Sequence, residues 1–230
     1  MHSSRLESSQ AYTLHDILRS MMLHYIKITA SAVATVLALV AYVPYLRDMF
    51  KGKAKPHLYT WISIFLVTAI VAYIQLIGGS GVGAIPIILG VGVDLVILFY
   101  CFKFGTKDVV FMDKVCLAAS IFGVFFYVAA HSRPFVSLVI VTAAEIIAFI
   151  PTFRKTRNDP FSESLPSYYL IMAKLSLILI ALQRYSLLTV SYSALWLLVF
   201  TVFLVSTYRW RAKVELNKHA VHATEDAPLI

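Results

Sequence analysis

The sequence predicts an all-α integral membrane protein with seven transmembrane helices in a 3+1+3 arrangement of two parallel three-helix-bundle repeats. Three observations predict this fold class. The chain is too apolar for a soluble domain, its apolar runs have the length of membrane spans, and a stretch near the end of the first run returns 107 residues later.

Composition places the chain in a bilayer rather than in water. Of its 230 residues, 60% are hydrophobic and 14% are charged, whereas a soluble domain carries about 25% charged residues. The net charge of +8 does not indicate a nucleic-acid partner, because the basic residues lie in the short gaps between apolar runs. Cys101 and Cys116 match no metal or redox spacing, and the histidines form no ligand cluster. We therefore expect neither a metal ion nor another cofactor.

The chain divides into five parts of different composition. Residues 1–24 are polar and mixed, and we expect them to be disordered apart from a short interfacial helix over 12–22. We expect no cleaved signal peptide, because the next apolar run has spanning length and lacks a small-residue cleavage site. The parts are a polar N-terminal extension at 1–24, a first three-helix repeat at 25–104, a linker transmembrane helix at 105–132, a second three-helix repeat at 133–210 and a cytoplasmic tail at 211–230.

Seven apolar runs supply the expected spans. Each is about 16 to 22 residues long, which suits a hydrocarbon core about 30 Å thick. We expect the third span to bend, because it carries Pro86 and two glycines. The glycine-rich stretch before it reads as a tight turn and not as a phosphate loop, because no Lys-Ser/Thr pair follows. The expected spans are 25–46, 58–77, 84–104, 115–130, 134–153, 167–183 and 187–208.

A repeated stretch relates the first span to the fifth. Pro44 near the end of the first span corresponds to Pro151 without a gap, and Arg47 to Arg154. Such a match at one fixed offset indicates that one structural unit occurs twice. With a single linker helix between them, the two units lie parallel in the membrane, related by an axis along its normal.

Basic residues predict the orientation of the chain. On one side of the expected spans lie 14 lysines and arginines, and on the other side lie 5. Because the cytoplasmic side carries the excess, the N-terminus is expected outside and the C-terminus in the cytoplasm. The short loops suit a bacterial inner (plasma) membrane.

The 3+1+3 arrangement, with a proline near the cytoplasmic end of the first helix of each repeat, resembles the PQ-loop superfamily, which includes the SWEET and SemiSWEET sugar transporters. The resemblance covers roughly residues 25–210. The chain departs from the family's Pro-Gln pair, since it has Pro44-Tyr45 and Pro151-Thr152. It looks like a divergent, bacterial-type member of the superfamily.

This resemblance implies a mechanism and a set of contacts. The two prolines would act as hinges, and a solute would lie between the repeats near the midplane, where residues of the third and last helices contact it. On this chain Asp94 is the third-helix candidate, the 107-residue offset places Thr201 opposite it, and Trp196 is a nearby aromatic residue.

Three charged residues lie deep in the expected spans: Asp94, Glu145 and Lys174. An isolated charge at mid-membrane costs between about 2.5 and more than 10 kcal/mol, so these side chains should face the bundle interior or a wet cavity. One interpretation is a solute site in which Glu145 or Asp94 takes up a proton while Lys174 holds the partner charge. The other is a structural ion pair of Lys174 with one carboxylate.

These observations together favour a membrane transporter that moves a small polar solute by alternating access, with proton coupling as an option. The alternative is a non-transporting receptor or assembly factor that uses the same seven-helix fold. An enzyme is not expected, because no nucleophile and base stand at a catalytic spacing. The expected partners are a small-molecule solute and the lipid bilayer, with a homo-oligomer left open.

Overall fold

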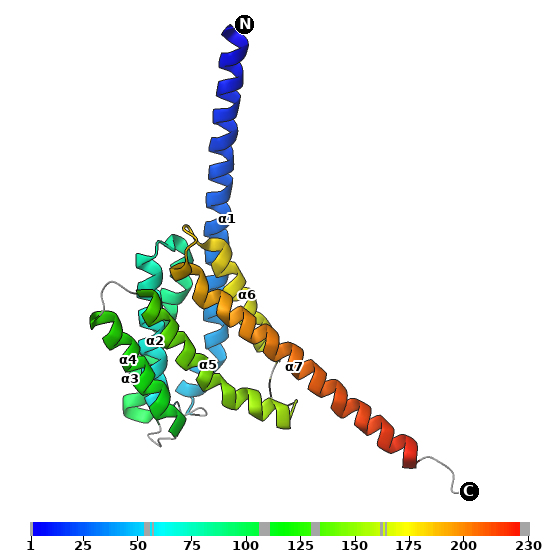
Figure 1. Cartoon of the computed structure of the whole chain (residues 1–230). Coiled ribbons are helices and arrows are strands. Elements are labelled where there is room, and N and C mark those ends of the chain that lie inside the picture. Colours follow the sequence, from blue (N-terminus) through cyan, green and yellow to red (C-terminus); the bar gives the residue numbers. More distant parts are fainter. Residues whose placement is uncertain are drawn as a thin grey trace.

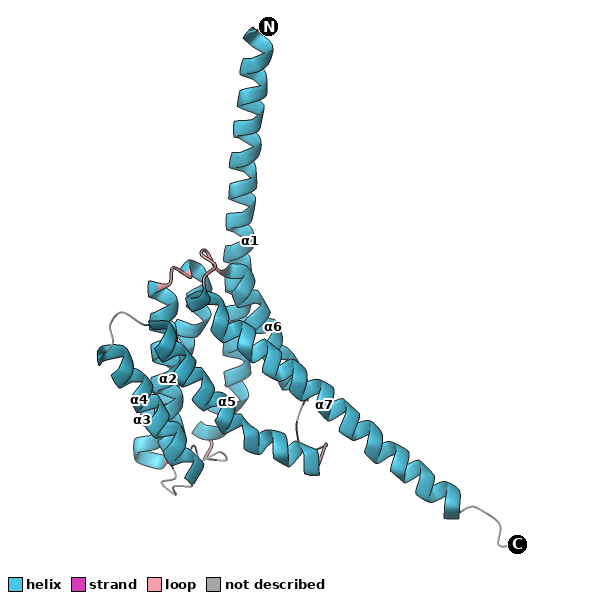
Figure 2. Ribbon diagram, in the orientation of Figure 1, coloured by secondary structure: helices cyan, strands magenta, loops and turns pink. Residues whose placement is uncertain are grey.

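The described part of the protein is built from α-helices. The computed structural model describes residues 2–52, 56, 58–105, 111–129, 134–161, 163 and 165–225, and these contain no β-strand (Figure 2). Their elements are α1 (His2–Phe50), α2 (Leu58–Ile77), the 3-10 helix η1 (Gly81–Ala84), α3 (Ile85–Phe104), α4 (Phe111–Ala129), α5 (Pro134–Asn158), α6 (Leu165–Ala181) and α7 (Leu187–Glu225).

Several of these helices are long and apolar enough to cross a membrane. By length and composition, five segments qualify in the described residues: His15–Phe50, Leu58–Ile77, Gly81–Phe104, Pro134–Asn158 and Leu187–Leu216. The apolar helix α6 is shorter, with 17 residues. Large hydrophobic side chains such as Phe99, Phe125 and Leu198 are exposed on the outside of the bundle, as expected where lipid replaces water. The chain is therefore an integral membrane protein with an all-helical fold.

Helix α1 differs from the sequence-based prediction at its N-terminal end. The sequence predicts that the extension at 1–24 is disordered apart from a short interfacial helix over 12–22, but a single helix of 49 residues begins at His2 and runs through both the extension and the first span. Lengthening an existing helix needs no new nucleation step, so a stable span can carry the polar residues before it in helical form. Figure 1 shows this N-terminal half of α1 projecting beyond the bundle.

The glycine-rich turn between α2 and α3 has the conformation that its residues suggest. Gly79 and Gly81 adopt φ values of +83° and +58°, a region that other residues rarely enter. Pro86 lies in the first turn of α3, where no helical hydrogen bond is lost. Pro86 therefore gives no reason for a bend, because this proline begins the helix instead of interrupting it.

The helices pack in a pattern that is not simply sequential. Helix α3 contacts both α1 and α2, and helix α7 contacts both α5 and α6. Helix α4 packs against α2 and α5. The most extensive helix pair is α1 with α6, which brings an early helix of the chain against a late one.

In Figure 1, α5 changes direction in its C-terminal half, the half that contains Pro151. A proline inside a helix is the usual cause of such a kink.

Two apolar clusters occupy opposite ends of the bundle. The turn-side cluster lies near the glycine-rich turn and is formed by α2 and α5, with Ile74, Val71 and Val141 fully buried. The loop-side cluster lies where α1 ends, around Met49, Ile97 and Cys101. There the Trp61 indole donates to the Tyr45 hydroxyl at 3.0 Å. Each cluster packs the helices together at its end of the bundle.

Replacement of Gly123 by alanine should destabilise the packing of α4 on α5. A Cβ atom added at Gly123 would lie 2.4 Å from Cγ1 of Val141, and overpacking of this kind costs about 1–3 kcal/mol. At Gly92 no atom lies within 4 Å of such a Cβ, so Gly92→Ala should be neutral or stabilise the helix by up to about 1 kcal/mol. Thermal unfolding in detergent measures both variants. Equal melting temperatures for the two would contradict the close approach of α4 and α5.

Candidate functional site

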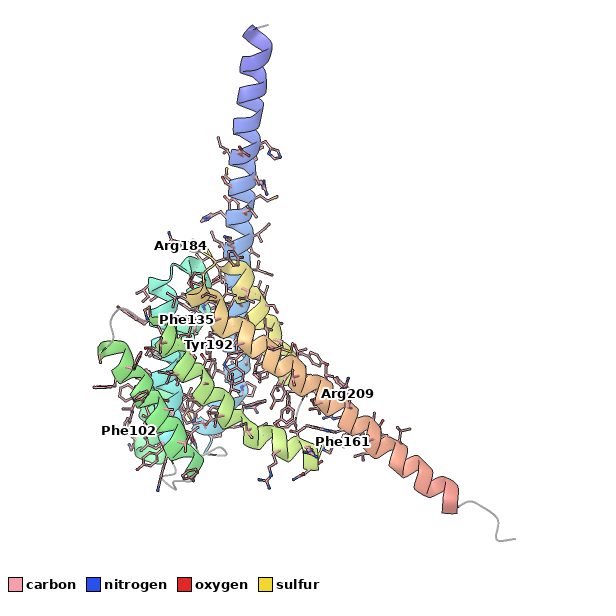
Figure 3. All side chains as sticks on the ribbon, in the orientation of Figure 1. Phe102, Phe135, Phe161, Arg184, Tyr192 and Arg209 are labelled. Carbon is pink, nitrogen blue, oxygen red and sulfur yellow. The ribbon has the colours of Figure 1, made fainter. Side chains whose placement is uncertain are left out.

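A cavity of about 240 Å³ lies between the two apolar clusters. Six helices line it, namely α1, α2, α3, α5, α6 and α7. Its wall is mixed: aliphatic side chains such as Ile64 and Ile178 stand beside charged and hydroxyl-bearing ones. Figure 3 shows Tyr192, one of the lining residues, on α7 between Arg184 at one end of the bundle and Arg209 toward the other. The cavity is therefore a partly open, partly polar space at mid-helix depth.

Lys174 brings a positive charge to this cavity from α6. Aliphatic residues of the same helix, Ile171, Leu175 and Ile178, line the wall around it. Lys174 lies within electrostatic range of Asp94 and Glu145. However, no salt bridge or hydrogen bond joins its ammonium group to another residue in the part of the chain that the structure describes. The expected close ion pair between Lys174 and a carboxylate is thus not present in this conformation.

Glu145 faces the cavity from the middle of α5 and is held by α7. The indole N–H of Trp196 donates to its Oε2 at 3.2 Å, and Tyr192 lies close enough to interact with the same carboxylate. Tyr192 and Trp196 stand four residues apart on α7, so both project from one face of that helix. These two aromatic donors orient the Glu145 carboxylate inside the cavity.

Asp94 is fully buried on α3 and is tied to α1. The Tyr42 hydroxyl, which lines the cavity, donates to Oδ1 of Asp94 at 2.9 Å. The other oxygen, Oδ2, has no hydrogen-bond partner. Asp94 itself is not a lining residue. It therefore stands directly behind the cavity wall, with Tyr42 between its carboxylate and the open space.

Ser193 supplies a second unpaired polar group to the cavity. Its side chain is 1% exposed, and its Oγ has no hydrogen-bond partner, although most buried hydroxyls in proteins are paired. It lies on α7, next in sequence to Tyr192, and lines the same cavity as Lys174. Because the Oγ atom is itself buried, the side chain would have to rotate before this hydroxyl could donate to, or accept from, a molecule in the cavity.

Aromatic rings continue from the cavity toward the loop side of the bundle. Phe149 of α5 packs edge-on against Trp196, Phe200 and Phe203 of α7, with ring centroids 5.9, 5.7 and 5.2 Å apart. Trp196 and Phe200 also line the cavity. The aromatic cluster thus forms one wall of the site and fixes the position of the Trp196 indole against Glu145.

The remaining residues that the sequence singled out lie away from the cavity. Thr201 is exposed, and its hydroxyl donates to the carbonyl oxygen of Leu197 in its own helix at 2.7 Å. Pro44 lies inside α1, six residues before its end at Phe50, and is exposed. Pro151 lies inside α5, and its side chain is outside the described residues. The structure therefore brings Glu145, Lys174 and Trp196 together, places Asp94 behind them, and leaves Thr201 outside.

Sequence reasoning missed three members of the site: Tyr42, Tyr192 and Ser193. A signal for two of them was present, because Tyr192 and Ser193 precede Trp196 by four and three residues and share its helix face. Tyr42 could be recognised only from the approach of α1 to α3, which no local pattern reveals. All three carry hydroxyl groups, the kind of side chain that orients a polar solute.

The donor set of this site is one of ammonium, carboxylate, hydroxyl and indole groups. No group of three or more His, Cys, Asp or Glu residues suited to a metal ion occurs in the described parts of the chain. Comparisons with protein-family models, with curated proteins and with solved structures find no match for this chain. Function must therefore be argued from the cavity itself.

Removal of the Tyr42 hydroxyl should destabilise the protein through Asp94. Tyr42→Phe leaves a buried carboxylate without its donor, which costs about 1–3 kcal/mol in the free energy of unfolding. In an Asp94→Leu background the same change should cost less, because no acceptor remains. Denaturant titration of the four proteins in this double-mutant cycle measures the coupling.

Thr201→Val is the matched control for this cycle, since Thr201 is exposed and bonded within its own helix. It should change the free energy of unfolding by no more than about 0.5 kcal/mol. If Tyr42→Phe costs the same with and without Asp94, the hydrogen bond does not contribute to stability.

Proposed function

We propose that the protein is a membrane transporter that moves a small polar solute by alternating access. One observation carries this proposal: a partly polar cavity with a lysine and a glutamate lies at mid-helix depth and is lined by helices from both halves of the chain. Ionisable residues at such a depth mark substrate or ion pathways in many membrane proteins. Glu145 and Asp94 are the candidates for coupling the movement to protons.

The helix packing supports a 3+1+3 arrangement. Helices α1, α3 and α2 form one chain of contacts, and helices α5, α7 and α6 form the corresponding one. We call these the first and second triplets. Helix α4 contacts α2 of the first triplet and α5 of the second, as a linker between them would. This arrangement agrees with a divergent member of the PQ-loop superfamily, and that membership is part of the proposal.

The two apolar clusters are suited to act as gates. The turn-side cluster joins α2 of the first triplet to α5 of the second, so a tilt of one triplet against the other would separate its halves. On the same side, the backbone N–H of Gln183 donates to the carbonyl oxygen of Ser80 at 3.0 Å and links the turns of the two triplets. Rocking about Pro44 and Pro151 would open one end while the other stays closed.

The distribution of basic residues supports an orientation with the C-terminus in the cytoplasm. On the loop side, basic residues lie in α1, α3, α5 and α7, namely Arg47, Lys103, Arg157 and Arg209. The described turn between α6 and α7, on the other side, carries Arg184. Because the cytoplasmic face attracts the basic excess, the glycine-rich turn would face the outside. A bacterial inner membrane fits this proposal.

Transport predicts that Pro44→Ala and Pro151→Ala will slow solute flux more than they weaken binding. An alanine restores the helical hydrogen bond that each proline lacks, so the kink that permits rocking is lost while the cavity side chains stay in place. Purified protein in liposomes measures flux, and thermal shift of the same preparations measures binding. A pH gradient added across the liposomes tests proton coupling.

Pro134→Ala is the control for the hinge variants. Pro134 is the first residue of α5 and is not among the residues that line the cavity, so flux should stay close to that of the unmodified protein. Binding without any flux in the unmodified protein would contradict transport and favour a receptor or assembly factor, which needs a site open to one side only.

A further inference from the structure

We propose that the solute of the central cavity carries a carboxylate group, which is bound by the Lys174 ammonium and the Ser193 hydroxyl. This inference rests on the proposed function only in that a solute must enter the cavity. It adds the chemical class of that solute: a small organic acid with a single carboxylate, and not a neutral polyol.

The charged side chains of the site differ in whether another side chain of the protein forms a hydrogen bond with them. Asp94 accepts a hydrogen bond from the Tyr42 hydroxyl at 2.9 Å, and Glu145 accepts one from the Trp196 indole N–H at 3.2 Å. The ammonium of Lys174 has no hydrogen bond or salt bridge among the described residues, although it lines the same cavity. Because a charge at this depth is costly without a partner, an acceptor is expected to come from the occupant of the cavity.

Ser193 gives an independent indication of the same group. Ser193 lines the cavity, and its Oγ is buried and lacks a partner, so a rotation of the side chain would bring an unpaired hydroxyl to a bound molecule. Ser193 projects from α7, and Lys174 projects from α6, which packs directly against α7. A carboxylate has two oxygens that accept hydrogen bonds, so it can take one from each helix. Bonds of this charge-assisted kind are about twice as strong as neutral ones.

The volume of the cavity limits the size of the acid, and the Glu145 carboxylate limits its number of negative charges. Its volume of about 240 Å³ is that of roughly eight water molecules at the density of the liquid, so the solute is small. Glu145 also faces the cavity and would repel a second negative charge. The aliphatic wall around Lys174 lowers the local dielectric and strengthens the single ion pair. A neutral sugar would offer the Lys174 ammonium no opposite charge, and its charge would then be balanced only at a distance by Asp94 and Glu145, which lie within electrostatic range without a direct bond.

Matched acids and amides test the inference. Lactate, benzoate and alanine are compared with lactamide, benzamide and alaninamide by thermal shift and calorimetry, in a buffer free of carboxylates. At least one acid should raise the melting temperature in a concentration-dependent way, and its amide should bind about tenfold more weakly or not at all. Alanine against lactate then reports whether Glu145 also accepts an ammonium group.

Variants connect the effect to the two donors. Lys174→Met should reduce binding of the acid by about 10- to 100-fold, Lys174→Arg should keep part of it, and Ser193→Ala should weaken it by a smaller factor. Thr201→Val, outside the cavity, should bind like the unmodified protein. If Lys174→Met does not fold, the decision comes from the acid and amide pairs together with Ser193→Ala and Lys174→Arg.

Several results would overturn the inference. They are equal binding of an acid and its amide, unchanged binding by Lys174→Met, or failure of every acid in the panel to bind. Flux of a neutral solute that is insensitive to Lys174→Arg would reject the carboxylate and leave transport intact. Acid binding that depends on Lys174 without flux of that acid would reject transport and leave the carboxylate site intact.

Discussion

The burial of three ionisable side chains in a chain that is 60% hydrophobic is the constraint on which the rest of the structure depends. A lone charge facing lipid costs from about 2.5 to more than 10 kcal/mol, so these groups must face inward and find partners. Glu145 and Lys174 accordingly face a common cavity between the helices. Large hydrophobic side chains cover much of the exposed surface of the bundle.

The proposed repeat carries a reversal of its chemistry. In the proposed first triplet the carboxylate belongs to α3 and the aromatic donor to α1, as Asp94 and Tyr42. In the proposed second triplet the carboxylate belongs to α5 and the donor to α7, as Glu145 and Trp196. One bond ties α1 to α3 and the other ties α5 to α7. If α5 corresponds to α1, the two triplets keep the same internal bond while they present different groups to the cavity.

Prediction from the sequence succeeded where one local pattern decides the outcome. Helix α2 covers the expected span, because charged and glycine-rich gaps bound it on both sides. The deep charges Glu145 and Lys174 and the ring of Trp196 line one cavity. The choice of Thr201 transfers the position of Asp94 through the 107-residue offset, which assumes that both repeats carry the same chemistry. That assumption does not hold, because the carboxylate of the second half lies on α5 and not on α7. Tyr42 could not be found from the sequence, because its role depends on the contact of α1 with α3.

The unpaired state of Lys174 has a further consequence for how a solute could change the conformation. A ligand shifts a conformational equilibrium only by its difference in affinity between the two states. Lys174 and Ser193 both belong to the second triplet, so a carboxylate bound to them alone would favour neither state. Tyr42, on α1 of the proposed first triplet, lines the same cavity. The rest of the solute must therefore reach α1 for its binding to draw the triplets together, and the small volume of the cavity makes that contact available even to a short molecule.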